Sequence, residues 1–171
     1  MSSIVPNVQF EQPLINSIPP QLLERYDPVF VEFYTKYNAG RLNIMSPHQV
    51  PYKEARAEPQ NYLVLYGHDL IPAVEKTTDH KVPVEGGEIT VRMYEPLTPV
   101  AEPRPIYINY HGGGFVHGGL QMYEDFCKRI VHELNIVVFD VDYRLSPEYT
   151  FPTPIADSWA ALNWVCEASN K

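Results

Sequence analysis

The pattern of apolar and polar positions changes along the chain, and the first change falls near residue 60. Before it, apolar side chains recur at helical spacing, at Leu22, Tyr26, Val29, Phe30, Phe33 and Tyr37. Asp27 stands before Pro28 within this run, which predicts that Asp27 caps a helix beginning at Pro28. Gly40 would end that helix, and the run from Ser46 to Gln49 resembles a capping box. This part of the chain therefore predicts a helical layer.

From Lys81 the apolar period becomes two, which is the period of a strand with one buried face. The alternation begins at Val82 and Val84, and a returning segment repeats it at Ile89, Val91 and Met93. Between them, Gly86-Gly87 predicts a two-residue turn and an antiparallel hairpin. Four prolines then predict an extended surface connection, at Pro96, Pro99, Pro103 and Pro105.

The last third of the chain alternates between strand and helix patterns. Ile106–Tyr110 is a short apolar run, and a helical stripe follows it at Tyr123, Phe126, Cys127, Ile130, Val131 and Leu134. Residues 136–139 are continuously apolar, as in a strand buried on both faces. Thr153 is expected to cap a helix beginning at Pro154, with an inward face of Ile155, Trp159, Leu162 and Cys166. This order predicts an α/β fold with a parallel sheet covered by helices.

Composition restricts the class of protein. The 171 residues are 44% hydrophobic and 20% charged, which suits one ordinary globular domain with a buried core. A formal net charge of -8 and the absence of a basic cluster argue against a nucleic-acid partner. No apolar run reaches membrane length, and prolines interrupt the region where a signal peptide would lie. We therefore expect no transmembrane segment and a cytoplasmic protein.

A glycine-rich run joins the strand Ile106–Tyr110 to the helix that follows. It reads His111-Gly112-Gly113-Gly114-Phe115-Val116-His117-Gly118-Gly119. Consecutive glycines permit positive φ and close approach to a ligand, so two backbone N–H groups there are suited to bind a developing negative charge. A dinucleotide fingerprint beginning at Gly112 would need glycine where His117 stands, and the Lys of a phosphate-binding P-loop is absent. A nucleotide site and a plain structural turn remain as weaker alternatives.

A second run, Asp142-Tyr143-Arg144-Leu145-Ser146-Pro147-Glu148, follows the buried strand. Together, the HGGG loop and this DYRLSPE run resemble the fold-3 α/β-hydrolases, the esterases and lipases related to hormone-sensitive lipase. The resemblance implies a partial α/β-hydrolase fold, with an N-terminal helical cap, an antiparallel hairpin and the start of a parallel sheet with flanking helices. Residues 1–60 would be the cap region, and residues 61–171 the N-terminal part of the hydrolase domain. The implied reaction is cleavage of a carboxylic ester, with no metal and no cofactor.

The resemblance also assigns roles to the glycine loop. Gly112, Gly113 and Gly114 would form the oxyanion hole, with Gly113 and Gly114 offering N–H groups and Gly112 permitting the turn. His111 would then brace the loop. For His111 and His117, a supporting role is favoured over a catalytic base, because a general base needs a nucleophile within hydrogen-bond reach.

The DYRLSPE run is expected to support the fold rather than the reaction. Asp142 and Arg144 would form a structural pair at the strand exit, with Glu148 as a further acceptor for the guanidinium. Asp157, in the first turn of the last helix, needs only the helix dipole as its explanation. Cys127 and Cys166 lie on apolar helix faces without metal-binding spacing, so both are expected to be buried free thiols.

The catalytic triad of the family is not identifiable in this sequence. The nucleophile motif G-x-S-x-G is absent, and the family order Ser, Asp or Glu, His fails because the last histidine is His132. A reversed triad of His111 or His117 with Asp142 and Ser158 can be written, but Ser158 falls inside a predicted helix. We expect the chain to end before the nucleophile elbow and to be inactive alone. A non-catalytic, receptor-like relative, as in the gibberellin receptors, and a truncated gene product are the alternatives.

The strand Ile106–Tyr110 also predicts how the chain behaves alone. In the family fold its second edge pairs with a later strand that this chain does not contain. No charged residue in the strand blunts that edge, so we expect self-association through it.

Overall fold

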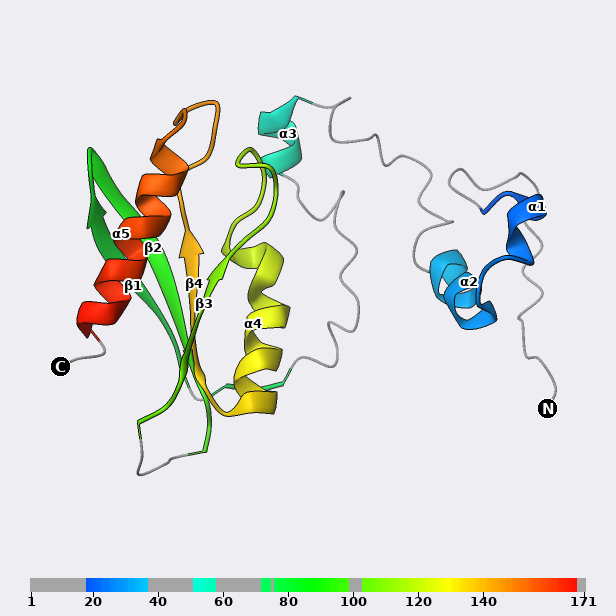
Figure 1. Ribbon diagram of the computed structural model, residues 1–171, viewed down its shortest axis with the longest axis horizontal. Helices are drawn as coiled ribbons and strands as arrows, with labels where there is room; N and C mark the ends of the chain where they lie inside the picture. The colour runs from blue at the N-terminus through cyan, green and yellow to red at the C-terminus, as the bar shows by residue number, and fades with distance from the viewer. Residues whose placement is uncertain (1–17, 37–50, 58–71, 75, 99–102, 169–171) are drawn as a thin grey trace. The chain divides into compact units, whose positions relative to one another are not determined.

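The computed structural model describes five stretches of the chain, which are residues 18–36, 51–57, 72–74, 76–98 and 103–168. The chain divides into two compact units, one formed by residues 1–64 and the other by residues 65–171. Figure 1 labels the helices and strands in chain order. The helix stop expected at Gly40 and the capping box expected at residues 46–49 lie outside the described residues.

The described residues of the first unit form three short helices, α1 (Pro20–Leu23), α2 (Pro28–Tyr34) and α3 (Tyr52–Ala57). The predicted cap of α2 is confirmed, because the Asp27 carboxylate accepts a hydrogen bond from the N–H of Val29 at 2.8 Å. Pro28 occupies the first helical position, where its missing N–H costs nothing. Tyr26, Phe30 and Tyr34 then follow one another at four-residue spacing, with ring centroids 5.4 and 5.8 Å apart.

The second unit is built on a four-stranded sheet in the order β1-β2-β4-β3. Its strands are β1 (Lys76–Val84), β2 (Gly87–Glu95), β3 (Ile106–Tyr110) and β4 (Val137–Asp142). β1 and β2 pair antiparallel, β2 and β4 pair antiparallel, and β3 and β4 pair parallel. The expected α/β architecture, with a hairpin followed by a parallel pair, is confirmed.

The hairpin turn lies one residue earlier than the sequence predicts. Val84 pairs with Gly87, so the two turn residues are Glu85 and Gly86 rather than Gly86 and Gly87. Gly86 has a φ of +74°, a conformation that favours glycine. The alternation of apolar residues is as predicted, and Val82 stands opposite Ile89 in the register.

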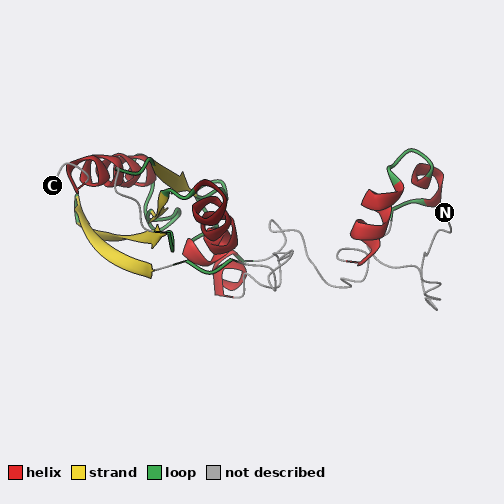
Figure 2. Cartoon of the chain, turned by 90° about the horizontal axis from the view of Figure 1, so that it is seen from below, coloured by secondary structure: helices red, strands yellow, loops and turns green. Residues whose placement is uncertain are grey.

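Two helices cover opposite faces of this sheet, α4 (Leu120–Leu134) and α5 (Thr153–Ala168), as Figure 2 shows. Successive residues of β4 point to opposite faces, so Val138 packs beneath α4 while Phe139 and Val141 pack beneath α5. The core on the α4 side consists of Tyr94, Cys127, Val131 and Val138. The larger core on the α5 side consists of Val82, Ile89, Val91, Phe139, Val141, Tyr143, Ala161 and Val165.

The buried face of α5 is the opposite of the predicted one. Trp159 is 63% exposed and Ile155 is 49% exposed, while Cys166 is also exposed rather than a buried thiol. The residues that α5 buries are Pro154, Asp157, Ala161 and Val165. The helix begins at Thr153, and the Pro152 carbonyl accepts the N–H groups of Ile155 and Ala156, so the helix starts one residue before the predicted position.

A row of polar side chains crosses the sheet beneath α4. Asp79 on β1 stands opposite Arg92 on β2, Arg92 opposite Asp140 on β4, and Asp140 opposite Asn109 on β3. Arg92 donates two hydrogen bonds to Asp79, at 2.6 and 2.9 Å, and Asn109 donates one to Asp140 at 2.7 Å. The pair of Asp79 and Arg92 lies at the more exposed end of the row. Asp140 and Asn109 at the other end are buried, and α4 covers the Asp140 carboxyl.

Candidate active site

The glycine loop leaves β3 at His111 and enters α4 at Leu120. Its backbone has positive φ at four glycines, which are Gly113, Gly114, Gly118 and Gly119. Phe115 also has a positive φ, of 61°, which only Asn135 shares among the described residues other than glycine. Such conformations cost free energy in an L-residue and persist where the surroundings hold them. The loop therefore has an irregular backbone, which glycine makes accessible at four positions.

The three consecutive glycines differ in what their N–H groups contact. The N–H of Gly112 donates to the Tyr123 hydroxyl at 3.2 Å. The N–H groups of Gly113 and Gly114 make no hydrogen bond to any described residue, whereas the Gly113 carbonyl accepts from the N–H groups of Val116 and His117. Two adjacent donors are thus left open for a ligand, beside a third donor that is already engaged.

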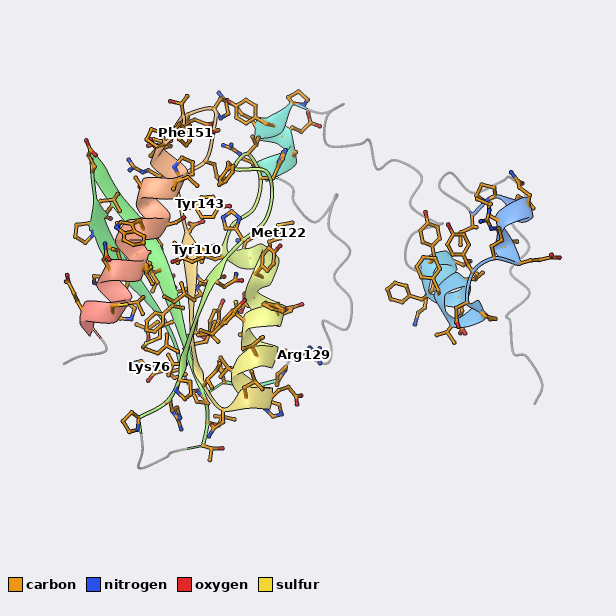
Figure 3. All side chains as sticks on the ribbon, in the orientation of Figure 1. Lys76, Tyr110, Met122, Arg129, Tyr143 and Phe151 are labelled. Atoms are coloured by element: carbon orange, nitrogen blue, oxygen red, sulfur yellow. The ribbon has the colours of Figure 1, made fainter. Side chains whose placement is uncertain are left out.

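Tyr143 from the DYRLSPE run holds the base of the loop. Its hydroxyl donates to the His111 carbonyl at 2.6 Å, and its ring stacks on the imidazole of His111 with centroids 4.2 Å apart. Figure 3 places Tyr143 toward the same end of the sheet as Tyr110, opposite the end that carries Lys76. The end of the sheet from which the loop emerges is therefore braced by Tyr143, the residue that follows β4.

His111 is buried, and burial lowers the pKa of its imidazole, although the Gly112 carbonyl and Asp142 oppose that shift. Its Nδ1 lies 2.8 Å from the Gly112 carbonyl, which fits a neutral ring whose Nδ1–H donates to that oxygen. Nε2 is buried and has no hydrogen-bond partner among the described residues. A Cβ at Gly118 would lie 2.1 Å from Nδ1, so only glycine lets the chain pass this close to the ring.

A backbone hydrogen bond joins the two signature runs directly. The N–H of Ser146 donates to the carbonyl of Phe115 at 2.8 Å. This bond constrains Phe115, whose positive φ would otherwise be unfavourable for an aromatic residue. The HGGG loop and the DYRLSPE run, separated along the chain, therefore form one connected structure.

The predicted pair of Asp142 and Arg144 is wrong, because Arg144 binds Asp157 on α5. The guanidinium donates to both carboxylate oxygens of Asp157, at 2.7 and 2.8 Å, and the Arg144 N–H donates to the same carboxylate at 3.1 Å. This hydrogen bonding raises the pKa of Arg144. The guanidinium also donates to the Glu85 carbonyl at 2.9 Å and lies 4.8 Å from the Tyr149 ring centroid. Asp157 is thus a buried ion-pair partner and does more than suit the helix dipole.

Two carboxyl groups of β4, Asp140 and Asp142, lie on the face of the sheet that α4 covers. Burial raises the pKa of Asp142, and His111 and Arg92 oppose the shift. Burial also raises the pKa of Asp140 to about 6, opposed by the hydrogen bond from Asn109. Glu148, the second acid of the DYRLSPE run, is exposed in the turn after β4.

The structure does not assemble the reversed triad. The Ser158 hydroxyl donates to the carbonyl of Pro154 on its own helix, at 2.8 Å. Its carbonyl accepts a hydrogen bond from the Tyr110 hydroxyl at 3.2 Å.

Within the described residues, no group of three or more His, Cys, Asp and Glu side chains is placed to hold a metal ion. No helix in that part of the chain combines the length and apolar character needed to cross a bilayer.

Sequence reasoning located the loop but missed the two tyrosines that hold it. Tyr123 lies on the apolar stripe of α4 and was expected to be a core residue. Tyr143 lies inside the DYRLSPE run, so its position was marked although its role was not. Which backbone group each hydroxyl reaches depends on tertiary contacts that periodicity does not contain.

Comparison with known proteins extends this description. Residues 107–171, which include both signature runs, match the family model of the alpha/beta hydrolase fold. An AB hydrolase superfamily protein of Schizosaccharomyces pombe is 32% identical over 149 residues, which are 84% of this chain and 43% of that protein. Carboxylesterase NlhH of Mycobacterium tuberculosis is 42% identical over 80 residues, 47% of this chain and 25% of that enzyme. Gibberellin receptor GID1B of Arabidopsis thaliana is 42% identical over 78 residues, 44% of this chain and 22% of the receptor.

A solved structure gives the same answer for the fold. The Pyrobaculum calidifontis esterase superposes with a TM-score of 0.66 at 28% identity, over 84% of this chain and 43% of the esterase chain. The chain spans less than half the length of the relatives it matches. Sequence motifs, strand order and these similarities agree. The chain belongs to the α/β-hydrolase fold family, in the group of esterases and lipases related to hormone-sensitive lipase.

Proposed function

We propose that this chain supplies the oxyanion-binding part of a carboxylic-ester hydrolase. The observation that carries the proposal is the pair of open N–H groups at Gly113 and Gly114, in a loop whose base is hydrogen-bonded to Tyr143 and Tyr123. During ester cleavage the carbonyl oxygen gains negative charge as the acyl carbon becomes tetrahedral, and preorganised amides stabilise that charge. The similarity to a carboxylesterase supports this substrate class. Gly112 completes the turn, and His111 braces it.

The remaining catalytic groups belong to a longer polypeptide in this proposal. Ester cleavage of this type needs a serine to attack the acyl carbon and a histidine to take its proton. The 171 residues contain no G-x-S-x-G motif and no histidine after His132. The chain by itself is therefore inactive toward esters.

Incubation of the 171-residue chain with a short-chain p-nitrophenyl ester and with a fluorophosphonate probe tests this proposal. We expect no stoichiometric labelling of a serine and only the weak turnover that oriented donors give without a nucleophile. Labelling of a single serine, with turnover abolished by its replacement with alanine, would overturn it.

The whole protein could instead be a ligand-binding relative that performs no turnover. The similarity to a gibberellin receptor favours this second candidate. Sequencing the transcript beyond the codon for Lys171 separates the two. A serine and a histidine in the family order support the hydrolase, replacement of either supports the receptor-like protein, and an immediate stop codon supports a truncated gene product.

Residues 1–60 are proposed to form a cap region, and residues 61–171 the N-terminal part of the hydrolase domain. In the first region, the capped helix α2 carries aromatic residues whose rings pack at four-residue spacing. The open edge of β3 is further proposed to make the isolated chain self-associate.

A further inference from the structure

Two tyrosine hydroxyls meet the same peptide unit at the start of the glycine loop. That unit joins His111 to Gly112, so its oxygen belongs to His111 and its N–H belongs to Gly112. The Tyr143 hydroxyl donates to the oxygen at 2.6 Å, and the N–H donates to the Tyr123 hydroxyl at 3.2 Å. Tyr143 follows β4, whereas Tyr123 lies in the first turn of α4. The peptide plane is therefore held from both sides by side chains of different elements.

The space around Gly112 matches this arrangement. A Cβ at Gly112 would lie 3.1 Å from the Tyr123 hydroxyl, closer than most real Cβ contacts. The hydroxyl thus occupies the space that a side chain at position 112 would need. Glycine at this position is explained by the approach of Tyr123 as well as by the turn.

The next two peptides lack such contacts on their N–H side. The N–H groups of Gly113 and Gly114 have no partner among the described residues. Because the backbone is continuous, the orientation of the plane between His111 and Gly112 limits where the following N–H groups point. The Tyr123 hydroxyl also engages the N–H of Gly112, which leaves its two neighbours as the open donors.

We propose that Tyr123 and Tyr143 are paired positioning residues, which clamp the peptide between His111 and Gly112 and thereby aim the Gly113 and Gly114 amides at a substrate oxyanion. The clamp rests on the proposed function for its purpose. Its geometry does not depend on turnover. Both residues act through the backbone and neither touches the reacting atoms.

Tyr123→Phe and Tyr143→Phe in the 171-residue chain test the clamp, because each keeps its ring and loses only the hydroxyl. Amide hydrogen exchange and the backbone NMR signals of residues 111–114 are the measurements. Tyr123→Phe should speed exchange of the Gly112 N–H about fivefold, the effect of losing one ordinary hydrogen bond. Tyr143→Phe should shift the carbonyl carbon signal of His111. The matched control is Tyr110→Phe, since the Tyr110 hydroxyl donates to Ser158 on the other side of β3.

The pattern separates a clamp from simple packing. A clamp predicts changes concentrated at the peptide between His111 and Gly112, and a double variant whose effects on Gly113 and Gly114 are not the sum of the single ones. Unchanged Gly112 exchange in Tyr123→Phe, or a uniform loss of protection across α4, would overturn it. Mass spectrometry of exchanged peptides across the loop gives the same comparison if the chain associates. These outcomes do not depend on the proposed esterase function. They would be the same if the downstream sequence proved to contain no serine nucleophile.

Discussion

Gly113 and Gly114 are neighbours, yet their surroundings differ. A Cβ at Gly113 would lie 2.0 Å from the carbonyl oxygen of His117, at a φ of +129°. A Cβ at Gly114 would meet no atom within 4 Å, at a φ of +61°. At Gly113 a side chain would both clash with the backbone and strain the φ angle. At Gly114 a side chain would have only the ordinary free-energy cost of a left-handed backbone conformation.

Gly113→Ala and Gly114→Ala should therefore differ in stability. We expect Gly114→Ala to lower the free energy of unfolding by about 1 kcal/mol, the cost of a left-handed alanine. Gly113→Ala should lower it by about 3 kcal/mol or more, because backbone strain adds to a clash with main-chain atoms. Urea denaturation of both variants checks this order. Equal losses would mean that the loop relaxes around the new methyl group.

Asp140 links stability to pH because its carboxyl is fully buried and one of its oxygens has no partner among the described residues. Burial raises the pKa of Asp140 to about 6, above the value of about 3.9 for an unfolded aspartate. The stability linked to this proton is present below about pH 3.9 and is lost as the pH rises through about 6. Nearby, Asn109 and Arg92 oppose the shift, while Asp142 adds to it.

Asp140→Asn should remove this pH dependence. Relative to the variant, the wild-type chain should lose on the order of 3 kcal/mol between about pH 4 and pH 7. Denaturation curves at a series of pH values measure the difference. Glu133→Gln, at an exposed position on α4, is the control and should leave the wild-type profile intact. Parallel profiles for wild type and Asp140→Asn would show that this carboxyl does not change its protonation on folding.

At the scale of elements, α5 shows why helical periodicity alone did not predict which face of a helix is buried. The helix is apolar on both sides, so spacing identified a helix but could not choose between the face with Trp159 and the face with Val165. The ion pair between Arg144 and Asp157 fixes the buried face. Asp157 is polar, and a search for apolar residues therefore placed it outward. The hairpin was predictable because its alternating apolar residues leave one choice of buried face. The parallel pair was predictable because a continuously apolar strand is buried on both faces, so no choice arises.

The two faces of α5 give a direct test. Val165 is 2% exposed and Trp159 is 63% exposed. Val165→Ala should lower the free energy of unfolding by about 2 kcal/mol, because it removes two buried methyl groups. Trp159→Ser should change it by no more than about 0.5 kcal/mol. Thermal or urea denaturation distinguishes these values. A larger loss of unfolding free energy for Trp159→Ser than for Val165→Ala would show that the face with Trp159 is the buried one.

The candidate site was partly predictable for a related reason. The glycine run and the DYRLSPE run carry local chemistry that a sequence displays, and both were located. The partner of Arg144 was mistaken, because Asp142 is near in sequence whereas Asp157 is brought near by the packing of α5. The contact between Arg144 and Asp157 depends on which face of α5 packs against the sheet, and the local sequence does not determine that face.

At the scale of the second unit, residues 65–171, the two edges of the sheet differ in character. The edge strand β1 carries Lys76, Asp79, Lys81 and Pro83, the residue types that discourage pairing with another chain. The edge strand β3 carries no charge and exposes Ile106, Tyr107 and Tyr110. The chain should therefore self-associate through β3 and not through β1.

Ile106→Lys places a charge on the β3 edge and should shift the chain toward monomer in light scattering. Thr77→Lys makes the same change on the β1 edge and should have no such effect, since charges already protect that edge. A wild-type chain that is a monodisperse monomer, with a cooperative thermal transition and dispersed amide NMR signals, would show that the half-sheet is self-sufficient.

The hydrogen bond from Ser146 to the carbonyl of Phe115 has a consequence for protein engineering. Because Tyr143 and Ser146 both bind the backbone of the glycine loop, the loop and residues 143–146 behave as one cassette. A graft of the glycine loop into a protein of the same fold would separate Phe115 from the amide that holds its unfavourable φ. A transplanted loop should keep its shape only if the second run travels with it.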